Sequence, residues 1–337
     1  MSALLKTWER LSSHGESGGG FVRLRLPEIG ACAVYAARSV ADELEAVLIE
    51  VPTESIPPRA EYAEARGLTA RAEMVSPGRS GVTRLVLALS DGRYRDIFHT
   101  LADDIVVKLE EATDEPEAVR LFITRLARWQ SFLRRHGHRG MSLEHRRGLF
   151  GELVLMQQHL LARTGPDTTI ASWKGCRGAN HDFQFSSGSI EVKTTSSNTP
   201  HAFHVANIRQ LDSPGQGQLF VYFVLIDETE AGDISLPELI ELLRDELDGT
   251  ARDAFEDCLI EAGYIESQRE LYASPRYSLR RERFYKVDES FPRLREAQLP
   301  SGVEEVRYQV ALAACQPCLA FESDVWDTIF GSMEGEW

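Results

Sequence analysis

The segment from His181 to Lys193 constrains the fold more than any other part of the chain, because apolar and polar residues alternate in it on both sides of a short turn. Residues 186–189 form that turn and separate the run HDFQF from the run IEVK. Successive side chains of a strand point to opposite faces. The pattern therefore predicts a β-hairpin with Asp182, Glu191 and Lys193 on one face and the apolar residues on the other.

A register with Phe185 opposite Ile190 places Asp182 opposite Lys193. The carboxylates of Asp182 and Glu191 then become diagonal neighbours, about 7 Å apart. Because Mg²⁺ prefers oxygen ligands and is usually held by one or two carboxylates plus water, this pair predicts a metal site. Lys193 is predicted to orient the attacking water or to stabilise phosphoryl charge. The alternative is an exposed face on which Asp182 and Lys193 form a surface ion pair, worth about 0 to 1 kcal/mol.

Glu152 adds a third carboxylate to this candidate site. The apolar residues of 142–163 follow helical spacing, Ser142 is suited to cap the helix, and Glu152 falls between Leu149 and Leu153 on the apolar stripe. An ionised side chain on a core-facing stripe needs a partner, because its desolvation costs several kcal/mol. The sequence allows a metal, a proton or a neighbouring arginine as that partner.

These motifs resemble the PD-(D/E)XK nuclease superfamily, in which a helix glutamate is followed by an aspartate and by an E-x-K strand. More narrowly, four runs resemble a bacterial group of PD-(D/E)XK motif proteins, and that likeness would cover most of the chain. The runs are GLFGEL at 148–153, HDF at 181–183, IEVKTT at 190–195 and VRY at 306–308. The chain departs from the motif at His181, which stands where the motif's name has proline.

The resemblance implies a restriction-endonuclease-like α/β core, with a mixed central sheet flanked by helices. It implies that Glu152, Asp182 and Glu191 bind Mg²⁺ or Mn²⁺ and that Lys193 is the catalytic lysine. The implied activity is that of a metal-dependent DNA endonuclease, a phosphodiester hydrolase acting in bacterial restriction or antiphage defence. The alternative is a non-catalytic DNA- or protein-binding subunit of a defence complex that keeps the fold.

A basic segment precedes the predicted active-site helix. The formal net charge of −15 argues against a protein that coats nucleic acid indiscriminately. Residues 120–147, however, contain eight arginines and a single acid, Glu144. Such a run is suited to hold a DNA backbone beside a metal site, and its alternatives are a solvated face or a docking surface for an acidic partner. The predicted DNA contacts are Arg134, Arg135, Arg139, Arg146, Arg147 and Gln210, the last with a surface amide as the alternative.

Apolar periodicity and Gly/Pro punctuation divide the chain into four predicted parts. Residues 1–100 read as a β-rich α+β domain, and 101–141 as a basic helical connector with helices at 103–111 and 116–135. Residues 142–227 hold the nuclease core. Residues 228–337 read as an extension with helices at 236–247 and 252–262 and a basic β-hairpin around 276–286, interpreted as a cover over the core sheet or, alternatively, as a winged helix.

Composition sets the expected surroundings. No apolar run is long enough to cross a bilayer, and no secretory signal pattern opens the chain, so we expect a cytoplasmic protein. Five scattered cysteines do not form a disulfide framework and are expected to be reduced. No Walker-type loop is present, so any ATP-driven step is expected from a partner. The expected partners are DNA and other defence proteins, with a homodimer left open.

Overall fold

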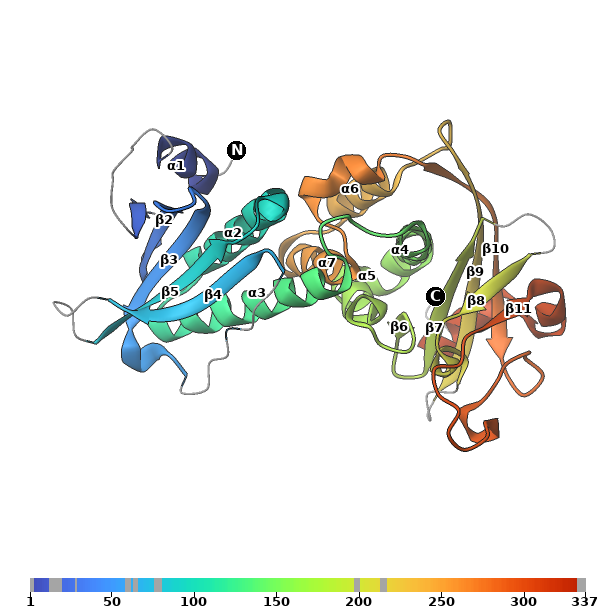
Figure 1. Cartoon of the computed structure of the whole chain (residues 1–337). Coiled ribbons are helices and arrows are strands. Elements are labelled where there is room, and N and C mark those ends of the chain that lie inside the picture. The colour runs from blue at the N-terminus through green and yellow to red at the C-terminus, as the bar shows by residue number, and fades with distance from the viewer. Residues whose placement is uncertain are drawn as a thin grey trace, which may run out of the picture. The chain divides into compact units, whose positions relative to one another are not determined.

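The computed structural model describes residues 3–11, 20–27, 29–57, 62, 66–75, 81–196, 201–212 and 217–331. The chain forms two compact units (Figure 1). The first contains Met1–Gly140 together with Ile265–Ser267, and the second contains Met141–Tyr264 and Gln268–Trp337. The segments predicted as a β-rich domain and a helical connector thus lie in the first unit, and the predicted core and C-terminal extension lie in the second.

The first unit is an antiparallel sheet with helices packed against it. Its strand order is β1-β2-β3-β5-β4. The apolar runs seen in the sequence fall in β2, β3 and β5. The strands are β1 (Phe21–Leu26), β2 (Ala33–Ser39), β3 (Glu45–Pro52), β4 (Leu68–Met74) and β5 (Val82–Leu89), and the helices are α1 (Ala3–Leu11), α2 (Arg95–Glu110) and α3 (Glu115–Arg135).

The predicted start of α2 at residue 103 is wrong, because the helix begins at Arg95. Ile97, Phe98 and Leu101 already belong to its buried stripe, so the apolar contact with the unit extends the helix toward its N-terminus. Helix α3 is close to its prediction. Asp114 caps it by accepting a hydrogen bond from the Glu117 backbone N–H at 2.8 Å.

The second unit is built on a mixed sheet of order β12-β10-β9-β7-β6. Strands β7 and β9 are parallel, and the other neighbours are antiparallel, so the predicted mixed central sheet is present. A separate pair, β8 with β11, is antiparallel. The strands are β6 (Phe183–Gln184), β7 (Gly188–Thr195), β8 (Ala202–Val205), β9 (Gln218–Thr229), β10 (Arg276–Val287), β11 (Tyr308–Ala311) and β12 (Leu319–Ala320).

Each face of this sheet has its own hydrophobic core. Helices α4 (Leu143–Leu155), α5 (Leu161–Ser172), α6 (Leu236–Glu246), α7 (Gly249–Ala262) and α8 (Glu322–Phe330) supply the larger core, which includes Phe220 and Tyr222 of β9. Strands β8 and β11 and the 3₁₀-helix Leu312–Cys318 supply the other, which includes Val221 and Phe223 of β9. Figure 1 shows α4 and α5 on one side of β7 and β9, with β8 and β11 on the other. The alternation of β9 between two buried faces explains its continuous apolar run.

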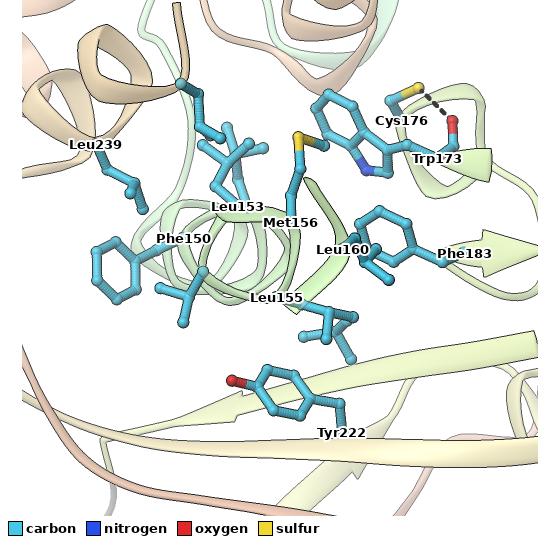
Figure 2. Packing of buried hydrophobic residues seen from close by; sticks show 14 of the residues in the cluster. Phe150, Leu153, Leu155, Met156, Leu160, Trp173, Cys176, Phe183, Tyr222 and Leu239 are labelled. Carbon is cyan, nitrogen blue, oxygen red and sulfur yellow. Dashed lines mark hydrogen bonds between the residues drawn. The ribbon is translucent and has the colours of Figure 1, made fainter. Parts of the chain in front are cut away.

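The helix that carries Glu152 is capped as predicted but is not a single regular helix. Ser142 accepts a hydrogen bond from the His145 backbone N–H at 3.2 Å. The chain forms a π-helical turn at Met156–Leu160 and then continues as α5, which has a non-helical residue at Gly165. Figure 2 shows Leu155 and Leu160 pointing from this helix toward Tyr222 and Phe183 of the sheet.

The basic β-hairpin predicted around 276–286 is wrong. Those residues form one strand, β10, which pairs along its length with β9. The predicted boundary at residue 227 lies inside β9, so the C-terminal part completes the core sheet and neither covers it as a hairpin nor forms a wing. The physical reason is burial: Tyr277, Phe284 and Tyr285 pack into the two cores, which a free hairpin could not provide.

Among the described residues, no helix combines the length and the apolar character that crossing a membrane requires.

Candidate active site

The hairpin forms, but its predicted register is wrong by two residues. Phe183, not Phe185, lies opposite Ile190, and Gln184 lies opposite Ser189. The Phe185 backbone N–H donates to the Gly188 carbonyl at 2.9 Å, so the turn contains two residues instead of four. Because side chains alternate with a period of two, a two-residue shift leaves every side chain on its predicted face.

Asp182 is held against the edge of β7 by its backbone and its side chain. Its carbonyl accepts hydrogen bonds from the N–H groups of Lys174 and Gly175 at 2.7 and 2.9 Å. Its Oδ2 accepts from the Val192 backbone N–H at 2.7 Å. A Cβ at position 175 would lie 2.4 Å from Asp182 Oδ1, so only glycine leaves room for this carboxylate. The orientation of Asp182 is therefore fixed by the main chain around it.

Glu191 and Lys193 are buried side by side on β7, with 1% and 7% of their surfaces exposed. Lys193 Nζ donates to Glu191 Oε1 at 2.7 Å and to Gln210 Oε1 at 2.8 Å. Gln210 Oε1 also accepts from the Ala206 backbone N–H at 3.0 Å. The exposed Asp182–Lys193 ion pair considered as an alternative does not form. Gln210, expected at the DNA, instead holds the lysine from the 3₁₀-helix Ile208–Leu211.

Glu152 reaches the same site from α4. Trp173 donates its indole N–H to Glu152 Oε2 at 2.6 Å. The arginine partner considered from the sequence is not used, because Arg147 pairs with Glu228 instead, through two hydrogen bonds of 2.6 Å. Helix α4 can approach β7 closely because residue 151 is glycine: a Cβ there would lie 1.9 Å from Thr194 Oγ1.

Burial raises the pKa values of all three carboxylates, and the charge of Asp182 adds to the shifts of Glu191 and Glu152. Burial and then the charge of Asp182 raise the pKa of Glu191 to about 8, although Lys193 works in the other direction. Burial and the charge of Asp182 also raise the pKa of Glu152 well above its usual range. Burial raises the pKa of Asp182, against the Val192 hydrogen bond and Lys193. Negative charge is therefore crowded here beyond what one lysine compensates.

One buried oxygen of the site, Glu191 Oε2, lacks a hydrogen-bond partner among the described residues. A second such oxygen on β7, Thr194 Oγ1, lies on the opposite face of the strand, toward Gly151 of α4. A buried, unpartnered oxygen costs about 1 to 3 kcal/mol and more when the group is charged, so such atoms mark places where a ligand belongs. An oxygen-rich, negatively crowded site of this kind fits a hard divalent cation.

The site is not a ready-made protein cage for a metal. Across the described ranges, no three His, Cys, Asp or Glu side chains converge closely enough to hold an ion by themselves. Mg²⁺ does not require such a cage, because it usually keeps several waters and takes one or two carboxylates. Asp182 and Glu191 would be those ligands, with Glu152 beside them.

A family model matches most of the chain. The model described as "Putative PD-(D/E)XK family member (DUF4420)" matches residues 4–313. The chain belongs to this family. The PD-(D/E)XK resemblance indicated by the motifs is therefore confirmed, and the matched range covers most of each unit and includes all four candidate catalytic residues. No curated protein and no solved structure matches the chain.

His181 occupies the position that gives the PD-(D/E)XK motif its proline. The side chain is buried, and its Nε2 lies 3.2 Å from the Asp212 carbonyl oxygen. Burial lowers the pKa of this imidazole. His181 therefore acts as a packed, hydrogen-bonded residue at the start of the hairpin in this member of the family.

The arginines predicted to contact DNA are divided between the two units. Arg134, Arg135 and Arg139 are exposed in the first unit. In the second unit, Arg146 lies over the Tyr272 ring with 4.9 Å to its centroid, and Arg147 is paired with Glu228. Structural contacts thus engage Arg146 and Arg147.

Trp173 and Gly175 contribute to the site but were not predicted from the sequence. Trp173 lies 21 residues after Glu152, and no helical period relates the two, because the π turn and the kinked α5 intervene. Gly175 looked like an ordinary loop glycine. The available signal was the short segment 173–178 just before the hairpin, which contains Trp173 and the two glycines Gly175 and Gly178.

Proposed function

We propose that this PD-(D/E)XK family member is a metal-dependent DNA endonuclease that hydrolyses phosphodiester bonds. The observation that carries the proposal is the Glu191 carboxylate, which is buried, has a pKa raised to about 8 and leaves Oε2 without a hydrogen-bond partner in the described structure. A divalent cation would neutralise the crowded charge and satisfy that oxygen. Superfamily members are generally nucleases, which favours this reading of the site.

Each residue has a role that follows from its contacts. Asp182 and Glu191 would hold Mg²⁺ or Mn²⁺, together with Glu152, which Trp173 orients. The bound cation would supply a Lewis acid for the phosphate and a nucleophilic water. Lys193 offers an ammonium fixed by two acceptors, and its remaining N–H can donate to water or to a phosphoryl oxygen. Gln210 would position that ammonium.

The arginines at the end of α3 are proposed as backbone contacts. Arg134 and Arg139 are exposed and make no ion pair with a described residue. Arg135 is exposed as well, and it donates a hydrogen bond to the Ser131 hydroxyl. Reversing the charge of Arg134 and Arg135 should weaken DNA binding similarly for all sequences and flatten its salt dependence by about one unit per lost contact. Unchanged affinity and slope would instead assign this surface to solvent or to a partner protein.

The proposed setting is bacterial restriction or antiphage defence, where other defence proteins would supply target selection and any ATPase. It comes from the motif resemblance, and a homodimer is compatible with it. The rival is a non-catalytic subunit that uses the same fold to bind DNA or protein. The retention of Glu152, Asp182, Glu191 and Lys193 in one site favours the enzyme, because a binding module has no need of crowded carboxylates.

The decisive experiment is incubation of purified full-length protein with supercoiled plasmid, with Mg²⁺, with Mn²⁺ and with EDTA. We expect nicking or linearisation only with the metals, and none by Asp182→Ala. A control variant, Glu228→Gln, removes a carboxylate that pairs with Arg147 away from the hairpin and should cleave normally. Metal-independent cleavage, or equal cleavage by Asp182→Ala, would contradict the proposal.

A further inference from the structure

An irregularity in β10 turns two arginines onto the face of the sheet that carries Glu191 and Lys193. The pairing of β10 with β9 shifts between Leu279 and Arg281, so Arg280 is an extra residue in the strand. Before this bulge, Tyr277 and Leu279 face the helix-side core. Beyond it, Arg281 and Arg283 share a face with Tyr285, which lies in the other core.

The bulge changes which side chains reach each face. In an uninterrupted strand, Arg281 and Arg283 would continue the Tyr277–Leu279 face and would point into the helix-side core. One inserted residue reverses the alternation. The two arginines are thereby placed outside the core, on the face of the candidate active site.

The sheet register relates these arginines directly to Lys193. Lys193 pairs with Phe223 in the parallel ladder, and Phe223 pairs with Arg283 in the antiparallel one. Adjacent strands are about 4.8 Å apart, so the backbones of Lys193 and Arg283 are separated by roughly 10 Å. Arg281 follows about 7 Å further along the strand.

The next row of the sheet leaves this face open toward solvent. Thr195 pairs with Leu225, and Leu225 pairs with Arg281. Thr195 and Leu225 are partly exposed and Arg281 is exposed, whereas Phe223 of the preceding row is covered. Phe203 of β8 packs near Phe223, and the centroids of the two rings are 6.3 Å apart. A bound polymer that extends from the active site can therefore pass over Thr195 and Leu225 to reach β10.

Arg281 and Arg283 differ from the neighbouring arginines of β10 in their ion pairing. Arg276 forms an ion pair with Glu238, and Arg280 forms one with Asp227. Arg281 and Arg283 are both exposed, and neither makes an ion pair with any residue in the described ranges. In a chain with a formal net charge of −15, two adjacent unneutralised guanidinium groups on the site's own face are available for an anionic ligand.

We propose that Arg281 and Arg283 bind the phosphate backbone of the substrate DNA next to the cleaved bond. This inference rests on the proposed nuclease function and adds the path of the substrate, from Lys193 over Thr195 and Leu225 to β10. Guanidinium groups suit this role because their planar donors match phosphate oxygens. The contact is independent of sequence, since it reads the backbone and not the bases.

Edge protection is the competing explanation for these charges. Strand β12 covers β10 only at Phe284 and Tyr285, so Arg281 and Arg283 lie on an uncovered stretch of the edge. Charged side chains on such an edge discourage strand-to-strand association. Edge protection requires a charged side chain on the strand but does not depend on which face of the sheet that side chain occupies. Cations on the two faces of β10 therefore distinguish the two explanations.

The test compares Arg283→Glu with Lys286→Glu in the full chain. Lys286 is a matched control, because it is an exposed cation on the same strand that makes no ion pair with a described residue and points to the opposite face. The affinity for a labelled DNA duplex is measured in EDTA at several salt concentrations, followed by cleavage kinetics with Mg²⁺. Thermal unfolding and light scattering establish that each variant is folded and monodisperse, with Arg283→Gln as a milder variant.

We expect Arg283→Glu to weaken binding by about tenfold and to lower the salt slope by about one unit, with a raised KM and a nearly unchanged kcat. The Arg281→Glu/Arg283→Glu double variant should lose about two units of slope, and Lys286→Glu should resemble wild type. Equal effects of Arg283→Glu and Lys286→Glu, or aggregation without a change in affinity, would overturn the assignment while wild-type cleavage still stands. A wild-type chain that neither binds nor cleaves DNA would overturn the nuclease function as well.

Discussion

Two clusters in the second unit combine carboxylates with a buried basic side chain, yet the pKa values of their carboxylates shift in opposite directions. In the candidate active site, Asp182 and Glu191 lie beside Lys193. In the second cluster, Glu282 of β10 and Glu322 of α8 flank His159 of the π turn, whose Nε2 and Nδ1 lie 3.4 and 3.1 Å from the respective carboxylates.

The His159 cluster is fully partnered. Tyr222 donates its hydroxyl to Glu282. Trp326 and Arg163 donate to Glu322 at 3.0 and 2.8 Å. The hydrogen bond from His159 holds the pKa of Glu282 below its usual value. Burial opposes the ionisation of Glu322, but the hydrogen bonds from Trp326 and His159 still hold its pKa low.

The burial and pairing of the carboxylates distinguish a structural charge cluster from a functional one. Where donors outnumber carboxylates, the pKa falls and the network joins elements, here the π turn, β10 and α8. Where the carboxylates are themselves largely buried and close together, desolvation raises their pKa values, and an oxygen such as Glu191 Oε2 is left without a partner among the described residues. Only the second arrangement has something to gain from a bound cation.

The largest expected effect is on catalysis. Lys193→Ala should lower the cleavage rate by about 10² to 10⁴-fold while keeping most of the metal affinity, because an ammonium stabilises the reaction but is not a metal ligand. Asp182→Ala should lose both cleavage and metal binding. Calorimetric titration with Mn²⁺ separates the two, and Glu282→Gln serves as the control from the His159 cluster. Equal Mn²⁺ affinity in wild type and Asp182→Ala would break the comparison.

The next effect is a pH-dependent stability of the metal-free protein. Folding raises the pKa of Glu191 from 4.5 to about 8, so the folded state holds this proton more tightly than the unfolded chain. That contribution is complete below about pH 4.5 and is lost as the pH rises through about 8. The pKa values of Asp182 and Glu152 are also raised by folding, so their contributions to stability depend on pH in the same direction.

We therefore expect the free energy of unfolding in EDTA to fall by a few kcal/mol between pH 5 and pH 8.5, as a rough magnitude. Glu191→Gln should flatten this dependence, and Mg²⁺ should restore stability at the higher pH. Urea unfolding at the two pH values measures both. A wild-type slope identical to that of Glu191→Gln would show that Glu191 does not retain a proton.

A smaller effect is expected from the His159 cluster, and it concerns stability alone. His159→Ala should destabilise the fold by about 1 to 3 kcal/mol, because it removes a buried ring that packs against Tyr222 and Phe284 and that hydrogen-bonds both carboxylates. Folding lowers the pKa values of Glu282 and Glu322, so both groups stabilise the fold at pH values above their pKa in the unfolded chain. This contribution is lost as the pH falls through their pKa values in the folded state. Mn²⁺ affinity and the cleavage rate of the folded variant should match wild type, and a loss of either would remove the distinction between the clusters.

The smallest effect tests how tightly Asp182 must be held. Gly175→Ala adds a methyl group that would meet Asp182 Oδ1 at 2.4 Å and Asp182 Cα at 3.0 Å, so the carboxylate has to move. Cleavage should fall by about tenfold, since small misplacements of a reacting group are costly. Gly178→Ala in the same loop meets no atom within 4 Å but has a positive φ of 76°, so it controls for loop strain alone. Similar activity of the two variants would contradict the steric argument.

The identity of the candidate site residues was accessible from local sequence because strand and helix periodicity is a property of the backbone. Glu191 and Lys193 lie two residues apart on one strand and share a face at any register. The pairing error was two residues, an even number, so Asp182 also stayed on its predicted face. Glu152 lay on an apolar stripe, and that position implied a buried partner. The mixed central sheet, by contrast, was implied by the family resemblance and not by any local pattern.

The partners of those residues, and the way the C-terminal part joins the core, depended on the tertiary structure. Trp173 beneath Glu152, Gln210 beside Lys193 and the strand β10 alongside β9 are all contacts between segments distant in sequence. No local period encodes them, because they arise when separate segments bury apolar surface against one sheet. The bulge at Arg280 shows this most clearly: a single inserted residue, set by pairing with β9, decides which face of the sheet Arg281 and Arg283 occupy.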